Sequence, residues 1–215
     1  MSNIFGQRIE SIDDFNALRS ELGQPSNVVS NKIIHSLDSY SKEFIGKSPF
    51  IVIATSDDQG CCDSSPRGDS PGFVYVVDEK HLFIPERPGN RRMDSIQNIL
   101  HNPHVGIIFI IPGMEETFRV NGKACISRDE ELLSKTAVNG KLPAMGIGVE
   151  IEECYMHCGK AFKRSNLWNA EKWLPESELP SASKIIAAHV SSNKMQVTEE
   201  QIKSGLEDTY KNRLY

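Results

Sequence analysis

The feature that most restricts the fold is a series of short, β-branched segments between residues 50 and 157, each followed by a turn signal. The first segment is Phe50-Ile-Val-Ile-Ala-Thr55, and the Asp57-Asp-Gln-Gly60 behind it is typical of a hairpin turn. Pro71-Gly72 and Pro112-Gly113 mark later turns. Many short strands joined in this way favour an antiparallel barrel over a doubly wound parallel sheet. We therefore expect strands at 50–55, 61–65, 73–77, 81–84, 104–111, 117–127 and 145–157.

Helical periodicity flanks this strand-rich region on both sides. Ile12, Phe15, Leu18 and Leu22 recur at helical spacing, and Gly23 follows them. The sequence predicts helices at 10–22, 31–45, 91–101, 159–170, 182–190 and 198–211. We expect one α+β domain over residues 1–215, with a helical N-terminal segment (1–46), a barrel core (47–158) and a helical C-terminal segment (159–215).

Charge and hydropathy exclude some partners. The 215 residues carry 24 Lys and Arg against 29 Asp and Glu, so the net charge of −5 disfavours nucleic acid as a partner. The longest aliphatic run, from Val105 to Ile111, is far shorter than the roughly 20 residues of a membrane helix. The first residues show no apolar stretch behind a basic one, so we expect a cytoplasmic protein without a membrane partner.

Five cysteines are an odd number for a disulfide framework, and reduced thiols are the simpler interpretation. Cys154 and Cys158, with Cys61 and Cys62, could be considered as zinc ligands. The chain has no Cys-x-x-Cys pair, and adjacent cysteines make a poor tetrahedral site. We therefore predict no metal site.

The stretch from Pro85 to Leu100 predicts an anion site at a helix start. Asn90 is a good N-cap residue, which would place Arg91 and Arg92 in the first helical turn. Cations oppose the helix dipole there, and a phosphate would satisfy both the arginines and the free amides. Arg91, Ser95 and Asn98 would share one helix face. Surface ion pairs with Glu86 or Asp94 remain the alternative, because such pairs are common and contribute only about 0–1 kcal/mol.

A second candidate stretch begins at Ser64 and Ser65. Gly68 beside Arg67 would allow a flat ring to approach the backbone, with the guanidinium facing the edge of the ring. The alternative is a polar loop between two strands that contains an Arg67–Asp69 pair.

The third candidate stretch follows the last long strand. It gathers His157, Lys160, Arg164 and Ser165, and places Trp168 one turn beyond Arg164. Basic groups beside an indole suit a phosphate or a planar ring. The alternative is an ordinary amphipathic helix, and a single histidine more often has a structural role than a catalytic one. His157 is the only side chain that we consider as a proton donor.

Together these stretches resemble a known family. The chain is similar to the pyridoxamine 5′-phosphate oxidase-like flavoproteins, and to a subgroup described only as FMN-dependent. The resemblance covers about residues 30–170. Its motifs are Pro49-Phe50, Ser65-Pro-Arg-Gly-Asp69, Ile84-Pro85, Pro88-Gly-Asn-Arg-Arg92, Asp94-Ser-Ile-Gln-Asn-Ile-Leu100, Asn102-Pro103, Arg119-Val-Asn-Gly122, His157-Cys-Gly-Lys-Ala161, Arg164-Ser165 and Leu167-Trp168.

The resemblance implies a six-stranded, mostly antiparallel split barrel that binds FMN, with flanking helices. It implies a homodimer with FMN at the subunit interface, where the C-terminal stretch reaches over the flavin of the neighbouring subunit. The FMN-binding residues implied by it are Ser64, Ser65, Arg67, Gly68, Asn90, Arg91, Arg92, Asn98, Lys160, Arg164, Ser165 and Trp168. The chain ends in Tyr210-Lys-Asn-Arg-Leu-Tyr215, where the vitamin B6 oxidases carry an Arg-Leu-His-Asp-Arg type segment, so vitamin B6 oxidation itself is not expected.

Three functional hypotheses follow. The first is an FMN-dependent oxidoreductase that moves hydride through flavin N5, with NAD(P)H or a small organic molecule as donor. No Gly-x-Gly-x-x-Gly motif follows a strand, so a nicotinamide would bind only transiently. Arg67, and after it Lys160, would stabilise the reduced flavin. The second hypothesis is a non-catalytic protein that stores or senses a flavin or haem, and the third is an interaction protein with an empty barrel.

Overall fold

The computed structural model describes residues 3–215, which form two compact units, 3–33 and 34–215. The first unit contains a 3-10 helix at Asn3–Phe5, helix α1 (Ile12–Leu22) and helix α2 (Asn27–Asn31). Ser11 caps α1 by accepting a hydrogen bond from the backbone N–H of Asp14. The prediction of the first helix is confirmed, while the prediction of one domain over residues 1–215 stays a prediction.

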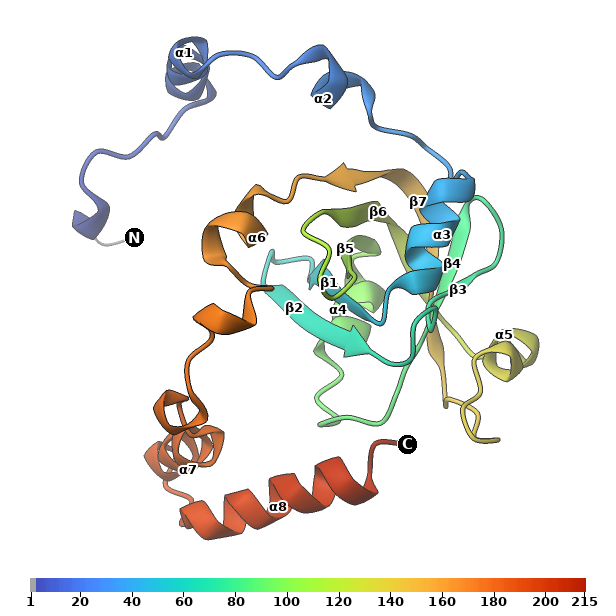
Figure 1. Cartoon of the computed structure of the whole chain (residues 1–215), viewed down its shortest axis with the longest axis vertical. Helices are drawn as coiled ribbons and strands as arrows, with labels where there is room; N and C mark the ends of the chain where they lie inside the picture. Colours follow the sequence, from blue (N-terminus) through green and yellow to red (C-terminus); the bar gives the residue numbers. More distant parts are fainter. Residues whose placement is uncertain (1–2) are drawn as a thin grey trace. The chain divides into compact units, whose positions relative to one another are not determined.

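The second unit is built on a seven-stranded antiparallel sheet, which confirms the α+β class (Figure 1). Its spatial order is β2-β1-β5-β6-β7-β4-β3. All seven predicted segments contain a strand. The resemblance implied six strands, and one of the seven observed, β3, has only two residues. The strands are β1 (Phe50–Ser56), β2 (Cys62–Gly68), β3 (Tyr75–Val76), β4 (His81–Pro85), β5 (His104–Ile110), β6 (Thr117–Ser127) and β7 (Gly146–His157).

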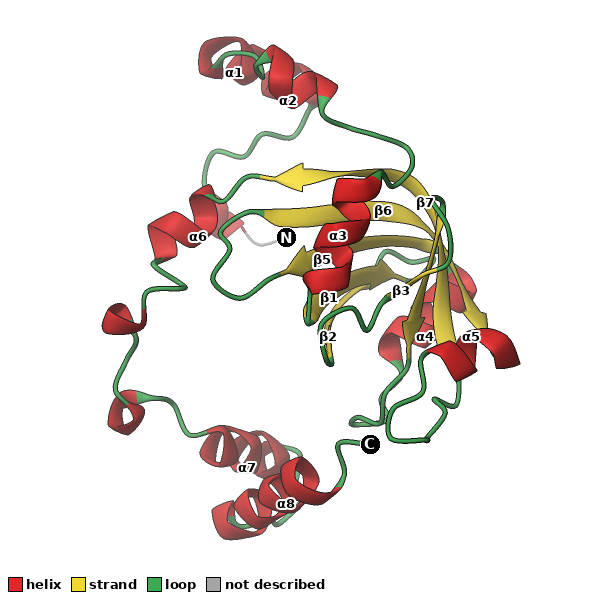
Figure 2. Ribbon diagram, turned by 45° about the vertical axis from the view of Figure 1, so that its right-hand side comes forward, coloured by secondary structure: helices red, strands yellow, loops and turns green. Residues whose placement is uncertain are grey.

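Alternating side chains explain how the central strands fill the interior. Ile51 and Ile53 on β1 pair with Phe109 and Ile107 on β5, and all four side chains are fully buried. Helix α3 (Ser39–Lys47) packs against β6, and helix α4 (Asp94–His101) packs against β1 and β6. Figure 2 shows the curved strands and these helices together. The hydrophobic core therefore lies between one curled sheet and two short helices.

The prediction of a helix over 31–45 is wrong in its first half. Ile34 is extended and exchanges both backbone hydrogen bonds with Cys154 on β7, at 3.0 and 2.8 Å. Helix α3 starts only at Ser39, after Asp38 accepts a hydrogen bond from the backbone N–H of Ser41. A pairing partner 120 positions away in the chain therefore overrides the local helical pattern.

Further helices follow the strands. Helix α6 is shorter than the predicted 159–170, because Asn166 takes a left-handed conformation (φ 51°) and ends it. Helix α5 (Glu130–Lys135) was not among the predicted helices. The remaining helices are α5 (Glu130–Lys135), α6 (Lys160–Ser165), two 3-10 turns (Ala170–Lys172 and Glu176–Glu178), α7 (Ala182–Ser192) and α8 (Glu199–Asn212).

No helix between residues 3 and 215 has both the length and the apolar character needed to span a lipid bilayer. The same part of the chain contains no group of three or more His, Cys, Asp or Glu side chains that could hold a metal ion. The five cysteines are free thiols. Burial raises the pKa of the Cys154 thiol to about 11, so this cysteine stays protonated at neutral pH.

Candidate functional site

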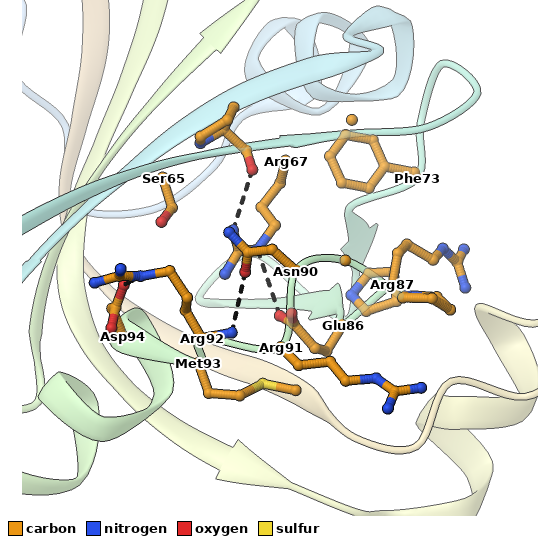
Figure 3. Close-up of a pocket in the computed structure, with 15 residues that line it drawn as sticks. Ser65, Arg67, Phe73, Glu86, Arg87, Asn90, Arg91, Arg92, Met93 and Asp94 are labelled. Carbon is orange, nitrogen blue, oxygen red and sulfur yellow. Dashed lines mark hydrogen bonds and ion pairs between the residues drawn. The ribbon is translucent and has the colours of Figure 1, made fainter. Parts of the chain in front are cut away.

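The barrel has an open seam, because β2 ends the sheet on one side while β4 and β3 end it on the other. Within residues 3–215, no strand pairs with the outer edge of β2. A cavity of about 290 Å³ lies in this seam, lined by Ser65–Gly68 of β2 and by the end of β4 with the loop that follows it (Figure 3). The lining side chains labelled there are Ser65, Arg67, Phe73, Glu86, Arg87, Asn90, Arg91, Arg92, Met93 and Asp94.

The strand β2 runs further than the sequence predicted. It continues through Pro66 to Gly68 and does not end at 65 as expected, and Val52 on β1 pairs with Pro66. A proline is tolerated there because β2 is an edge strand, where a missing N–H can face away from its neighbour. The interpretation of Arg67 and Gly68 as part of a polar loop is therefore wrong, and both residues lie on the strand that forms one wall of the cavity.

Four arginines line the cavity, and their charges are balanced to different degrees. Arg92 pairs with Asp94 at 2.7 Å, in an exposed position where the side chain of Arg92 is 73% accessible. This is the surface ion pair that the sequence left open as an alternative. Arg91 is exposed, and among residues 3–215 it forms no ion pair or side-chain hydrogen bond. The positive charge most available to a ligand in the cavity therefore belongs to Arg91. Arg92 is available as well, because an exposed ion pair contributes little and its partner can be replaced.

Arg67 and Glu86 face each other across the seam. Arg67 Nε lies 3.4 Å from Glu86 Oε2, and the two side chains are only 18% and 14% exposed. Both of these atoms are buried, and neither has a hydrogen-bond partner, because the 3.4 Å contact is an ion pair without hydrogen-bond alignment. Arg67 Nη1 donates instead to the carbonyl of Pro66 at 3.1 Å.

Arg87 and Asp69 form a second, tighter pair across the same seam. Arg87 Nε donates to Asp69 Oδ2 at 2.6 Å, and the Asp69 side chain is 2% exposed. Asp69 also accepts hydrogen bonds from the backbone N–H of Ser70 and from the hydroxyl of Tyr215. Burial opposes its ionisation, but the hydrogen bonds from Tyr215, Ser70 and Arg87 outweigh burial and hold the pKa of Asp69 below its usual value.

The loop before α4 corrects the predicted helix start. Helix α4 begins at Asp94, not at Arg91, and its N-cap is Met93, which is left-handed (φ 61°, ψ 24°) and lacks a side-chain capping bond. Arg91 is left-handed as well (φ 62°), and Asn90 Oδ1 accepts from the backbone N–H of Arg92 at 3.0 Å. The physical reason is the helix dipole, which favours an acidic Asp94 over two arginines in the first turn.

The left-handed conformation of two non-glycine residues indicates strained backbone beside the cavity. A residue with a Cβ costs roughly 1–2 kcal/mol in the left-handed region. Arg91 and Met93 both adopt it, on either side of Arg92 and at the edge of the cavity. Strained backbone of this type clusters at ligand sites.

Helix α4 is tied to the sheet by polar contacts below the cavity. Asp63 accepts hydrogen bonds from Ser65 Oγ at 2.8 Å and from Ser95 Oγ at 2.7 Å. Burial works against the charge of Asp63, but the hydrogen bonds from Ser95 and Ser65 lower its pKa overall. Asn98 donates to Thr55 Oγ1 at 3.0 Å and does not line the cavity. Ser95 and Asn98 therefore face the sheet. The prediction that they share a helix face with Arg91 is wrong, because Arg91 precedes the helix.

Ser64 also lies outside the cavity. Successive residues of a strand point to opposite faces, so Ser64 faces away from Ser65 and lines a shallow groove with Ala54 and Asn121.

The predicted C-terminal stretch forms a cluster of its own. Trp168 Nε1 donates to the carbonyl of Met114 at 2.8 Å, and the Trp168 ring stacks on Phe162 with centroids 5.7 Å apart. Ser165 Oγ donates to the carbonyl of Phe162. His157 stacks on Tyr155. Lys160 and Arg164 are exposed on α6, and no member of this cluster lines the cavity of the same chain.

The structure therefore brings together Ser65, Arg67, Gly68, Asn90, Arg91 and Arg92 around one cavity, and leaves out Ser64, Asn98, Lys160, Arg164, Ser165, Trp168 and His157. Sequence reasoning missed the partners that face each other across the seam. It considered an Arg67–Asp69 pair, whereas Arg67 faces Glu86 and Asp69 binds Arg87. The strand alternation of β2 and the Glu86-Arg87 sequence directly after β4 are signals that could have indicated these pairings.

Comparisons with known proteins give one family match and several similar solved structures. A family model described as pyridoxamine 5′-phosphate oxidase matches residues 37–158. The solved structure of HupZ from Group A Streptococcus is 18% identical and covers 56% of this chain and 93% of its own, with a TM-score of 0.47. A putative pyridoxamine 5′-phosphate oxidase from Lactobacillus delbrueckii is 20% identical and covers 58% and 98%, with a TM-score of 0.46. HutZ, the heme storage protein from Vibrio cholerae, is 20% identical and covers 55% and 93%, with a TM-score of 0.40. A search of the curated proteins found no match.

Proposed function

The chain belongs to the pyridoxamine 5′-phosphate oxidase family, and from this premise we propose that it is an FMN-dependent oxidoreductase with FMN bound in the barrel seam. The family model spans more than half of the 215 residues, including every residue that lines the cavity. When bound, FMN would supply hydride chemistry at its N5 atom, with NAD(P)H or a small organic molecule as donor. The residues of the chain would bind the cofactor, orient its ring and adjust its charge.

We assign the phosphate of FMN to Asn90, Arg91 and Arg92. The observation that carries the proposal is that the guanidinium groups of Arg91 and Arg92 are exposed beside the cavity. Arg91 forms no ion pair within the described residues, while Arg92 is held only by an exposed pair with Asp94. A dianionic phosphate can therefore take both guanidinium groups at little cost in lost contacts. The left-handed Arg91 and Met93 hold this short loop at the edge of the cavity.

The ring is assigned to the wall formed by β2. Ser65, Arg67 and Gly68 lie on that strand, and its outer edge carries backbone groups that no other described strand pairs with. Backbone amides and one guanidinium along a flat wall suit the polar edge of an isoalloxazine ring. Arg67 Nε and Glu86 Oε2 are buried and without hydrogen-bond partners beside this wall, which fits a site completed by a polar ligand.

A homodimer is part of the proposal. A cavity of about 290 Å³ lies at the lower end of the range for small-molecule sites, so we expect other groups to cover the rest of the cofactor. Several outward side chains of the neighbouring strands β1 and β5 are apolar, with Phe50 37% exposed and Val52, Ile108 and Ile110 partly exposed. Such a face is suited to contact with a second copy. The cluster around Lys160 and Trp168 would then reach the cavity of the neighbouring subunit.

The test is a native spectrum of the purified protein, followed by anaerobic titration with NADH and NADPH. We expect bound FMN with flavin absorption bands, and bleaching of the flavin at a catalytic rate. A protein that neither retains nor takes up FMN contradicts the proposal. Bound flavin that no nicotinamide reduces, or haem binding in its place, favours the storage or sensing alternative. Light scattering at low micromolar concentration should give a dimer, and a monomer of 24.0 kDa would contradict the shared site.

A further inference from the structure

Two pairs of an arginine and a carboxylate cross the seam. On the β2 side stand Arg67 and Asp69, and on the β4 side stand Glu86 and Arg87. The charges are arranged in opposite order, so that each arginine faces a carboxylate of the other wall. The charges of these four residues sum to zero, and the two on each wall cancel each other.

The two pairs differ in how firmly they are made. Arg87 and Asp69 share a hydrogen bond of 2.6 Å, and Asp69 accepts two further hydrogen bonds. Arg67 and Glu86 stay 3.4 Å apart, and their facing atoms are buried without any hydrogen bond. The first pair holds the two walls together, while the second brings two charges close without locking them.

The Glu86 side chain is not needed to anchor its own loop. Its backbone N–H already donates to the carbonyl of Met145 at 3.0 Å, and the neighbouring Arg87 is fixed to Asp69. What remains for the carboxylate is its charge, held beside Arg67 in a partly buried place where water screens it weakly.

We propose that Glu86 is a positioning residue that sets how much positive charge Arg67 presents to the ring of a bound flavin. This inference rests on the proposed function and concerns the same cavity. An uncompensated Arg67 would favour the reduced ring, which carries more negative charge than the oxidised one. Glu86 offsets that charge, so the pair moderates the preference of the site for reduced over oxidised FMN.

The test measures the midpoint potential of bound FMN together with its dissociation constant. In Glu86→Gln, we expect reduced FMN to bind at least tenfold more tightly relative to oxidised FMN than in the unchanged protein. This corresponds to a potential about 30 mV more positive for a two-electron couple. In Arg67→Gln/Glu86→Gln, the ratio should return to within about threefold of the unchanged protein. Glu43→Gln is the matched control, because it makes the same change in net charge at an exposed helix position.

The outcomes separate the two proposals. Failure of the unchanged protein to bind FMN overturns the proposed function and this inference with it. FMN binding with an unchanged potential in Glu86→Gln overturns the inference alone, as does a double variant that keeps the full shift. If Glu86→Gln does not fold, Arg67→Gln tests the inference with the opposite sign. We expect Arg67→Gln to make the potential more negative, and Arg67→Gln/Glu86→Gln to reverse that shift. A shift that persists in the double variant overturns the inference.

Discussion

The closed wall of the barrel and its seam are held by different forces. Along β1, β5, β6 and β7, backbone ladders and fully buried side chains such as Ile107 and Val120 stabilise the sheet, with one register shift between β6 and β7 at Asn121 and Gly122. Across the seam, no backbone ladder is formed by the residues that the structure describes, and the contacts include the ion pairs Arg67–Glu86 and Arg87–Asp69. A loop that contains left-handed residues lies at the same place. Ile107 and Val120 do not line the cavity, whereas Arg67, Glu86, Arg87 and the loop with the left-handed residues do. We therefore expect the wall to contribute most of the stability and the seam to contribute less stability but to determine binding.

The largest expected effect is on the wall. Ile107→Ala removes a fully buried side chain, so we expect a loss of about 2–5 kcal/mol in the free energy of unfolding. Denaturant titration measures it, with Ile108→Ala, which faces outward and is partly exposed, as a control with a much smaller loss. The affinity of the folded Ile107→Ala protein for FMN should stay within about threefold, since Ile107 does not line the cavity. A large loss of affinity would erase the distinction between wall and seam.

The next effect concerns the firm ion pair of the seam. Asp69→Asn removes a charge-assisted hydrogen bond, and we expect a loss of about 1.5–3 kcal/mol in the free energy of unfolding at pH 7. The folded state lowers the pKa of Asp69, so its contribution is complete above its ordinary value of 3.8 and is lost as the pH falls through the lower, folded value. Denaturant titrations at pH 7 and below pH 3.8 should show the difference between the two proteins shrinking in acid. Equal stability at pH 7 would mean that Asp69 does not join the walls.

A third effect should appear in binding alone. Arg91→Ala or Arg92→Ala should weaken FMN binding by about 1.5–3 kcal/mol, through loss of a charge-assisted bond to the phosphate. Quenching of flavin fluorescence measures the affinity, and the exposed Arg128→Ala controls for the change in net charge. The free energy of unfolding should barely change in either variant. Unchanged affinity in both would show that the phosphate lies elsewhere.

The smallest effect isolates the strained loop. Arg91→Gly and Arg91→Ala remove the same guanidinium, but only glycine adopts a φ of 62° without strain. We expect Arg91→Gly to be more stable than Arg91→Ala by about 1 kcal/mol in the absence of ligand, as measured by thermal or denaturant unfolding. A less stable glycine variant would contradict the left-handed conformation of this loop.

Local patterns predicted most of the wall, because hairpins are short-range structures. Strand alternation and turn residues such as Pro112-Gly113 identified all seven strand segments. The errors fall where distant residues decide. Ile34 has a helical pattern, yet it pairs with Cys154, and nothing near Ile34 in the sequence indicates that partner.

The sequence predicted which arginines line the loop before α4, but not the start of the helix or the ion pairs across the seam. The sequence shows several arginines before α4. Two arginines in the first turn of a helix would oppose the helix dipole. The chain resolves this conflict by delaying the helix to Asp94, where an acidic residue suits the first turn. The ion pairs across the seam join residues at or just beyond the ends of two different strands, Arg67 with Glu86 and Asp69 with Arg87. Their pairing depends on how the sheet curls, which no short stretch of sequence encodes.

The open edge of β2 has a consequence for the behaviour of the protein in solution. An unpaired strand edge invites a strand from another molecule, which is a common start of aggregation. Pro66 sits in the middle of β2 and has no N–H, so an incoming strand would lack one donor at its centre. The same proline that lies in the cavity wall thus also hinders uncontrolled assembly along the side of the barrel where we propose that the cofactor binds.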